Sequence, residues 1–209
     1  MKILIIDDHD LFAEGLKLLI KSLDTQADST LASTYADGMK HLQHDSESTN
    51  FKLILLDYQL PDASAEETIP SICAEAGSTP VVVISSEDDR EIIRQSIHAG
   101  AAGFVPKSSS KQELISALKL ILNGGTFLPR QVLHSLKKDD TASNLNLLTK
   151  QQRRILSFVV KGTANKVIAS KLDIAEGTVK AHLHNAYKLL GVNNRTEAVV
   201  AVAKHKIKF

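Results

Sequence analysis

The sequence predicts an α/β domain built on a doubly wound parallel sheet, followed by a small all-α domain. In the first half of this 209-residue chain, predicted strands, four of them short apolar runs, alternate five times with segments of helical periodicity. Such runs, bounded by polar residues, are typical of strands buried on both faces of a parallel sheet. The second half shows helical patterns instead, and its charge balance is opposite to that of the first. These observations indicate two domains with different roles.

The predicted α/β domain contains five strands and five helices. The predicted strands are Ile3–Ile6, Ser29–Ala32, Phe51–Leu56, Pro80–Ile84 and Gly103–Val105. The predicted helices are Leu11–Leu23, Tyr35–Leu42, Glu66–Ala76, Glu91–Ala99 and Ser110–Asn123. We expect Asp10 to cap the first helix and Pro70 to start or kink the third. Because right-handed crossovers allow few other arrangements, this alternation favours helices on both faces of one sheet.

Polar side chains follow several of these strands directly. Asp7 and Asp8 end the first, Asp57 the third, Ser85 the fourth and Lys107 the fifth. The carboxyl ends of parallel strands meet at one edge of a sheet, so we expect one pocket. Carboxylates held close together attract a hard cation such as Mg²⁺, and an aspartate there can act as a nucleophile toward phosphorus. The alternative for any one acid is an ordinary solvated strand end.

The same residues resemble a known family. Residues 1 to about 128 are similar to the receiver domain of two-component response regulators, on the motifs IIDDH, LLDYQLP, VVVISS and AGAAGFVPK. The resemblance implies a flavodoxin-like order of five strands. It also implies phosphorylation by a sensor histidine kinase or a small phosphodonor, with Asp57 as the phosphoacceptor. For Mg²⁺ it implies that Asp8 and Asp57 are direct ligands, the backbone carbonyl of Gln59 a third, and Asp7 a ligand mostly through water.

The resemblance also implies a switch. Lys107 would form a salt bridge with the phosphoryl group, Ser85 would move toward it, and Phe104 would rotate into the space that Ser85 leaves. Two positions depart from the family pattern: Ala65 stands where a glycine is usual, and a proline, Pro106, precedes the lysine instead of following it. The first departure affects the loop that would carry the Gln59 carbonyl.

The domain boundaries are predicted from composition. We expect a receiver domain over residues 1–124, a linker over 125–146 and a second domain over 147–209. Gly124 and Gly125 end the last helix of the first domain, and Gln131–Lys137 is predicted as a short helix within the linker. Up to Leu128 there are 10 Lys and Arg against 19 Asp and Glu, and from Pro129 onward 15 against 5. The acidic half should repel nucleic acid and the basic half should attract it.

The basic half predicts four helices that include a helix-turn-helix. They extend from Thr149, as N-cap, to Val160, over Ala164–Leu172, over Glu176–Leu190 and over Thr196–His205. On the third helix, Lys180, Ala181 and His184 are predicted to share an outer face that can enter a major groove. Further residues are placed for phosphate contacts: Thr178, Asn165, Lys166 and Lys188. The alternative is a helical bundle with a solvated basic face.

This half resembles the LuxR-type DNA-binding domain of the NarL/FixJ subfamily. The signature includes Leu148-Thr149, Gly162, Asn165-Lys166, Thr178-Val179-Lys180, Leu190-Gly191-Val192 and Arg195. Gln151-Gln152 replaces a usual Arg-Glu pair, Ala175 replaces a usual Ser or Thr cap, and Gly177 loosens the same turn. The resemblance implies a homodimer on double-stranded DNA, with Thr196, Val199 and Val200 on the last helix as contacts. It also implies that the unphosphorylated receiver covers the recognition helix.

We therefore expect a cytoplasmic, phosphorylation-controlled transcription factor rather than an enzyme, without a membrane segment. No apolar run reaches the ~18 residues of a membrane span, and the first strand leaves no room for a secretory signal. Cys73 is the only cysteine, which fits a reducing compartment. Three alternatives remain: a regulator that does not use phosphorylation, a phosphatase-like enzyme, and a module that binds protein. Gln59 argues against the enzyme, because no second acid stands two residues after Asp57.

Overall fold

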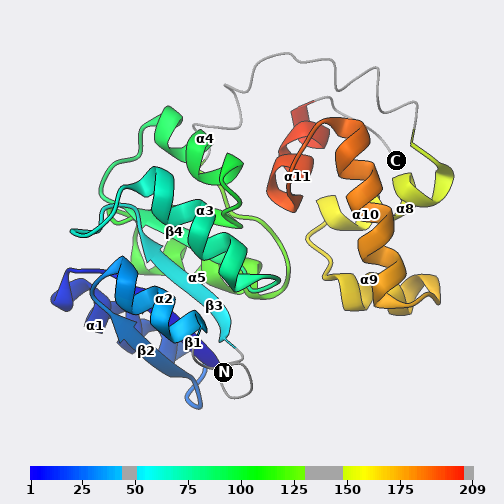
Figure 1. Ribbon diagram of the computed structural model, residues 1–209. Coiled ribbons are helices and arrows are strands. Elements are labelled where there is room, and N and C mark those ends of the chain that lie inside the picture. The colour runs from blue at the N-terminus through cyan, green and yellow to red at the C-terminus, as the bar shows by residue number, and fades with distance from the viewer. Residues whose placement is uncertain (44–50, 130–147, 205–209) are drawn as a thin grey trace.

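A computed structural model of the chain describes residues 1–43, 51–129 and 148–204, which form two domains (Figure 1). The N-terminal domain is a five-stranded parallel sheet in the order β2-β1-β3-β4-β5. The strands are β1 (Lys2–Ile6), β2 (Asp28–Ala32), β3 (Phe51–Asp57), β4 (Val81–Ser85) and β5 (Gly103–Pro106). This order confirms the predicted doubly wound, flavodoxin-like fold.

Helices cover both faces of this sheet. They are α1 (Asp10–Leu23), α2 (Tyr35–Gln43), α3 (Ala65–Ala76), α4 (Arg90–His98) and α5 (Lys111–Leu122). Alternate residues of one strand enter opposite cores: Ile3 and Ile5 pack with α1 and α5, whereas Leu4 and Ile6 pack with the helices of the other face. The central strands are therefore apolar on both sides, which is why their sequences are continuous apolar runs.

Two details of the helices differ from the sequence prediction. Helix α1 begins at Asp10, so His9 and not Asp10 is the N-cap, and its side chain makes no capping hydrogen bond. Pro70 does not start the helix, because α3 begins at Ala65 and runs past it to Ala76; the alternative, a kink at Pro70, stays a prediction. The predicted helix Gln131–Lys137 lies outside the described residues.

The C-terminal domain consists, within the described residues, of α8 (Lys150–Val160), α9 (Asn165–Leu172), α10 (Glu176–Leu190) and α11 (Arg195–Lys204). Helices α9 and α10 form the predicted helix-turn-helix. One apolar core joins all four helices and is centred on Ile155, Ile168, Val179 and Ala198. The domain therefore has a core of its own, separate from the two cores of the sheet.

Two of the positions that depart from the family sequence, Gln152 and Ala175, lie at the starts of α8 and α10. Thr149 and Gln152 form a reciprocal capping box at the start of α8, so glutamine at this position still satisfies two backbone N–H groups. Ala175 precedes α10 as an N-cap without a side-chain hydrogen bond. The turn between α9 and α10 contains Asp173 at φ 53°, a left-handed conformation that Asp tolerates better than most residues.

Candidate functional site

The predicted acidic pocket forms at the carboxyl end of the sheet. Asp7 and Asp57 are buried, each with 3% of its surface exposed, whereas Asp8 is exposed to solvent. Lys107 Nζ lies 2.8 Å from Asp57 Oδ2 and 3.0 Å from Asp7 Oδ2. The structure thus brings together the acid pair, the third aspartate and the lysine that the sequence placed at separate strand ends.

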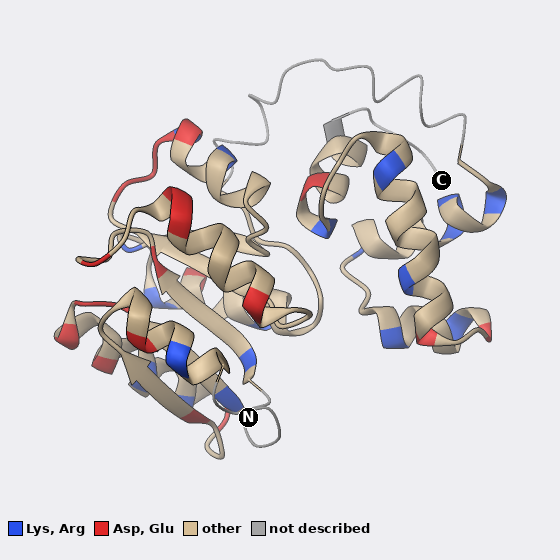
Figure 2. Cartoon of the chain, viewed as in Figure 1, with Lys and Arg blue, Asp and Glu red and all other residues tan. Residues whose placement is uncertain are grey.

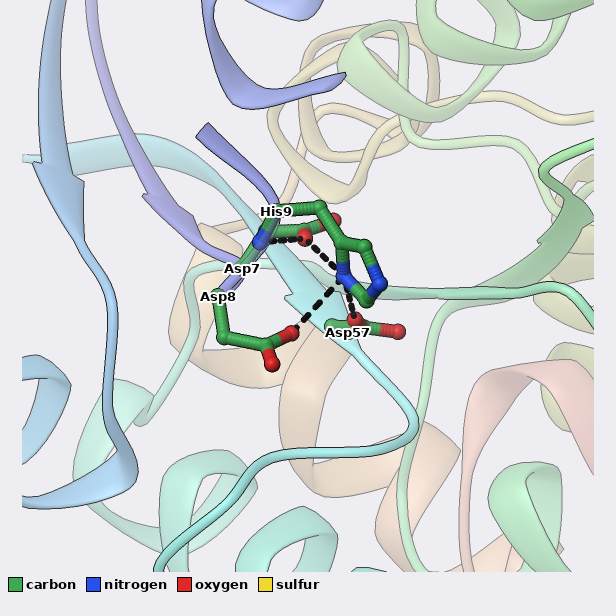
Figure 3. A group of neighbouring side chains, drawn as sticks. All are labelled: Asp7, Asp8, His9 and Asp57. Carbon is green, nitrogen blue, oxygen red and sulfur yellow. Dashed lines mark hydrogen bonds and ion pairs between the residues drawn. The ribbon is translucent and has the colours of Figure 1, made fainter. Parts of the chain in front are cut away.

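His9 joins this cluster, although it is not among the pocket residues predicted from the sequence. Its Nδ1 atom lies 2.8 Å from Asp8, 3.2 Å from Asp7 and 3.6 Å from Asp57 (Figure 3). Its backbone N–H donates to Asp7 Oδ1 over 2.8 Å. The signal available in the sequence was its position directly after the acid pair in IIDDH.

The pocket carries more acidic than basic groups, and burial together with the neighbouring charges shifts the pKa values of Asp57 and Lys107. Burial raises the pKa of Asp57; the hydrogen bond from Lys107 lowers it, and the nearby charge of Asp7 raises it again, so that the net shift is upward. Burial lowers the pKa of Lys107, but its hydrogen bonds to Asp57 and Asp7 outweigh this and raise it overall. A hard cation would relieve the excess negative charge.

The donor atoms fit such a cation. Asp7, Asp8, His9 and Asp57 each bring one candidate ligand atom to within 4.8 Å of the others. Three of the four are carboxylates, the ligands that Mg²⁺ prefers over nitrogen. The residues present therefore suit Mg²⁺, with Asp8 as the accessible carboxylate.

The remaining predicted pocket residues lie around Asp57. Ser85 is buried, and its Oγ accepts a hydrogen bond from the backbone N–H of Glu87 at 3.0 Å. The backbone N–H of Gln59 points to Asp57 Oδ1 at 3.4 Å, and its side chain donates to Glu87 Oε1 at 2.7 Å. Phe104 is fully buried in the core on the α3 and α4 side of the sheet. Its position is that of an inward-facing core aromatic.

The predicted recognition helix is α10. Its inner face is the predicted one, with Val179, Leu183, Ala186 and Leu190 buried. The proposed groove-facing residues Lys180, Ala181 and His184 are exposed, as are Lys166, Thr178 and Lys188, whereas Asn165 is half-buried. Lys180 also pairs with Glu176, one turn earlier, at 3.2 Å. Basic side chains predominate in this domain (Figure 2).

Comparison with known proteins assigns both domains. Residues 3–119 match the model of the response regulator receiver domain, and residues 146–202 match that of bacterial regulatory proteins of the luxR family. The chain belongs to the response-regulator family. It is 35% identical to the glycerol metabolism activator of Pseudomonas putida, over 96% of this chain and 94% of that protein. It is 31% identical to the nitrate/nitrite response regulator protein NarL of Escherichia coli K12, over 98% of this chain and 96% of that protein.

A solved structure agrees with this assignment. A LuxR family DNA-binding response regulator from Silicibacter pomeroyi is 37% identical and superposes with a TM-score of 0.55, over 63% of this chain and 98% of that one. The response regulator described here is therefore a transcription regulator with a receiver domain and a LuxR-type DNA-binding domain, and not an enzyme. No helix in the described part of the chain is long and apolar enough to cross a membrane.

The two domains of this response regulator touch through α11 and the end of α4. Asn194 Nδ2 donates to the carbonyl of Ile97 at 2.8 Å, and Thr196 Oγ1 donates to the carbonyl of Ala102 at 3.3 Å. His98 Nδ1 lies 2.9 Å from Glu197 Oε1. We name these three pairs the α4–α11 contact. Ala102 lies two residues before Phe104, so the contact borders the predicted switch strand.

A groove between the domains includes part of the predicted DNA-binding face. Lys180, Lys166 and Asn165 line it from the DNA-binding domain, opposite Lys52, Thr79 and other receiver residues. Ala181, His184 and Lys188 are not among its lining residues. The first turns of α9 and α10 therefore face the receiver domain, whereas the rest of the recognition face does not.

Proposed function

We propose that Asp57 is the phosphoacceptor and that its phosphorylation by a sensor histidine kinase controls DNA binding. In the transfer, a carboxylate oxygen of Asp57 bonds to phosphorus while the bond from phosphorus to the donor breaks, and the donor leaves with that electron pair. The observation that carries the proposal is a buried carboxylate 2.8 Å from a lysine ammonium, beside further acids. Family membership supports the same reaction.

The chain's own groups each have a part in this transfer. Lys107 neutralises charge on the phosphoryl oxygens, and Ser85 donates to one of them after it has moved. Asp8, Asp57 and the Gln59 carbonyl would hold Mg²⁺ directly, and Asp7 would hold it mostly through water. When bound, Mg²⁺ supplies charge neutralisation of the phosphoryl group. Phe104, which is already buried, is proposed to shift into the space that Ser85 leaves and so to alter the receiver surface next to it.

The proposed DNA interface is one face of the helix-turn-helix. Lys180 contacts a guanine, Ala181 a thymine methyl, and His184 a base edge or a phosphate. The remaining residues contact phosphates: Asn165, Lys166, Thr178 and Lys188. We propose a homodimer on DNA through α11, at Thr196, Val199 and Val200, in the cytoplasm. We propose domain limits of 1–124 and 147–209 with a linker over 125–146; the matched ranges 3–119 and 146–202 support a division into two units.

The α4–α11 contact is proposed to hold the protein in its inactive form. Thr196 is 2% exposed and bonded to the receiver, so it cannot contact the second copy of the chain at the same time. Lys180 and Lys166 line the groove between the domains, where the receiver domain obstructs the approach of a duplex. Phosphorylation would change the strand next to Ala102. It would thereby free both the dimer contact at Thr196 and the DNA-binding residues Lys180 and Lys166, by a shift between two states.

The direct test is phosphorylation by acetyl phosphate, read by intact mass. We expect one phosphoryl group on the wild-type protein, dependent on Mg²⁺, and none on Asp57→Asn. Asp88→Asn is the matched control, because Asp88 is an exposed acid in the loop after β4, and it should be modified like the wild type. Undiminished modification of Asp57→Asn would refute the assignment of the phosphoacceptor.

A further inference from the structure

Asp62 makes an unusual long-range contact beside the phosphorylation pocket. It lies at the tip of a tight turn after β3, closed by pairing of Leu60 with Ala63. Its carboxylate crosses to the start of α2, where Oδ1 accepts from the Tyr35 backbone N–H at 2.8 Å and Oδ2 accepts from the Ala36 backbone N–H at 3.0 Å. One exposed side chain thus connects the loop of Gln59 to a different helix.

This contact completes the N-terminus of α2. The first N–H groups of a helix lack partners within it and need acceptors from elsewhere. Thr34 Oγ1 accepts from the Asp37 N–H at 3.1 Å and the Thr34 carbonyl accepts from the Gly38 N–H, which leaves the first two groups to Asp62. Slight burial raises the pKa of Asp62, but these two backbone hydrogen bonds outweigh it and lower the pKa overall. The carboxylate is therefore charged and held in place at neutral pH.

Helix α2 is in turn fixed on the strand that carries the acid pair. A Cβ added at Gly38 would lie 2.5 Å from Ile6 Cδ1, so the helix packs on β1 at van der Waals distance. Ile6 immediately precedes Asp7 and Asp8. The two sides of the pocket, the acid pair after β1 and the Gln59 loop after β3, are thus joined through α2 and Asp62.

We propose that Asp62 is a positioning residue that holds the Gln59 carbonyl at the Mg²⁺ site. This rests on the proposed function, in which that carbonyl is a metal ligand. The loop lacks the glycine usual at Ala65, and α3 begins with Ser64 as an N-cap that makes no side-chain hydrogen bond. The Ser64 side chain therefore does not hold the loop by capping α3, and the hydrogen bonds between Asp62 and the start of α2 hold it instead. Groups that orient metal ligands commonly matter nearly as much as the ligands.

The test is the Mg²⁺ dissociation constant of the full chain, measured by titration calorimetry. For Asp62→Ala we expect binding weaker by roughly tenfold, as for other residues that orient a ligand. Asp62→Asn keeps one oxygen acceptor and should fall between the wild type and alanine. Amide NMR shifts of Tyr58–Leu60 on addition of Mg²⁺ should shrink or broaden in the alanine variant, which reports on the loop independently of phosphorylation.

Two controls separate positioning from other effects. Asp37→Asn removes a negative charge from the same helix end without touching the loop, and Thr34→Ala removes a neighbouring capping hydrogen bond of α2. Both should bind Mg²⁺ like the wild type. The proposal is overturned if Asp62→Ala also binds like the wild type, or if either control is weakened as much. Failure of the wild type itself to bind Mg²⁺ would instead contradict the proposed function.

Discussion

Replacing Lys180 and His184 together by alanine is expected to abolish specific DNA binding by the activated protein. Both side chains are exposed on the outer face of α10, one turn apart, opposite the buried Val179 and Leu183. A side chain that reads a base edge contributes about 1–3 kcal/mol of discrimination, so removing two should weaken binding by roughly 100-fold or more. The measurement is fluorescence anisotropy on a duplex selected from a random pool, with beryllofluoride as the phosphoryl mimic.

The control for this variant is Arg154→Ala, which removes one exposed positive charge from α8 of the same domain. It should retain most of the affinity. The dependence of affinity on salt should become shallower in the double variant by at most roughly one unit of slope, the share of one phosphate contact by His184, because Lys180 is placed at a base edge. Undiminished duplex binding by the Lys180 and His184 variant would favour the module that binds protein, or a different recognition surface.

Replacing Lys107 by methionine is expected to slow phosphorylation of Asp57 by roughly 100-fold, the usual cost of removing one positioned group that stabilises transition-state charge. Lys107 is the ammonium nearest to Asp57 and also contacts Asp7. Its hydrogen bond lowers the pKa of Asp57, so its removal should raise that pKa further. The measurement is the rate of phosphoryl uptake from acetyl phosphate at saturating Mg²⁺.

The Mg²⁺ affinity of Lys107→Met distinguishes a slower phosphoryl transfer from general damage to the pocket. Removing a cation from an acidic pocket should leave Mg²⁺ binding unchanged or make it tighter, because less positive charge competes for the carboxylates. Lys111→Met, an exposed substitution at the start of α5, is the matched control and should react like the wild type. An unchanged phosphorylation rate in Lys107→Met would remove this lysine from the mechanism.

The sequence predicted the sheet and most of the pocket because the underlying patterns are local. The strands β1, β3 and β4 contain continuous apolar runs, and Asp7, Asp57 and Lys107 follow apolar stretches abruptly. Parallel strands bring their carboxyl ends to one edge, so topology alone was enough to place these residues together. The helix-turn-helix was predictable for a similar reason, since the inner face of α10 repeats at helical spacing.

Features that depend on contacts between distant segments were not predictable from such patterns. Asp10 has the residue type of an N-cap, yet the helix begins one residue earlier, and His9 in the cap position turns its ring toward the acids. The carboxylate of Asp62 reaches a helix 26 residues earlier in the chain. The α4–α11 contact joins residues almost 100 positions apart, mainly through backbone carbonyls that every sequence has.

Coupling between the pocket and the recognition helix is measured most simply as the change in DNA affinity on addition of beryllofluoride. Full-length wild-type protein and Asp57→Asn would be titrated on the selected duplex in the presence of Mg²⁺. We expect beryllofluoride to tighten DNA binding by the wild type and to leave that of Asp57→Asn unchanged, because only the wild type releases the α4–α11 contact. Strong binding by the wild type that is indifferent to beryllofluoride would show that the pocket does not control the recognition helix.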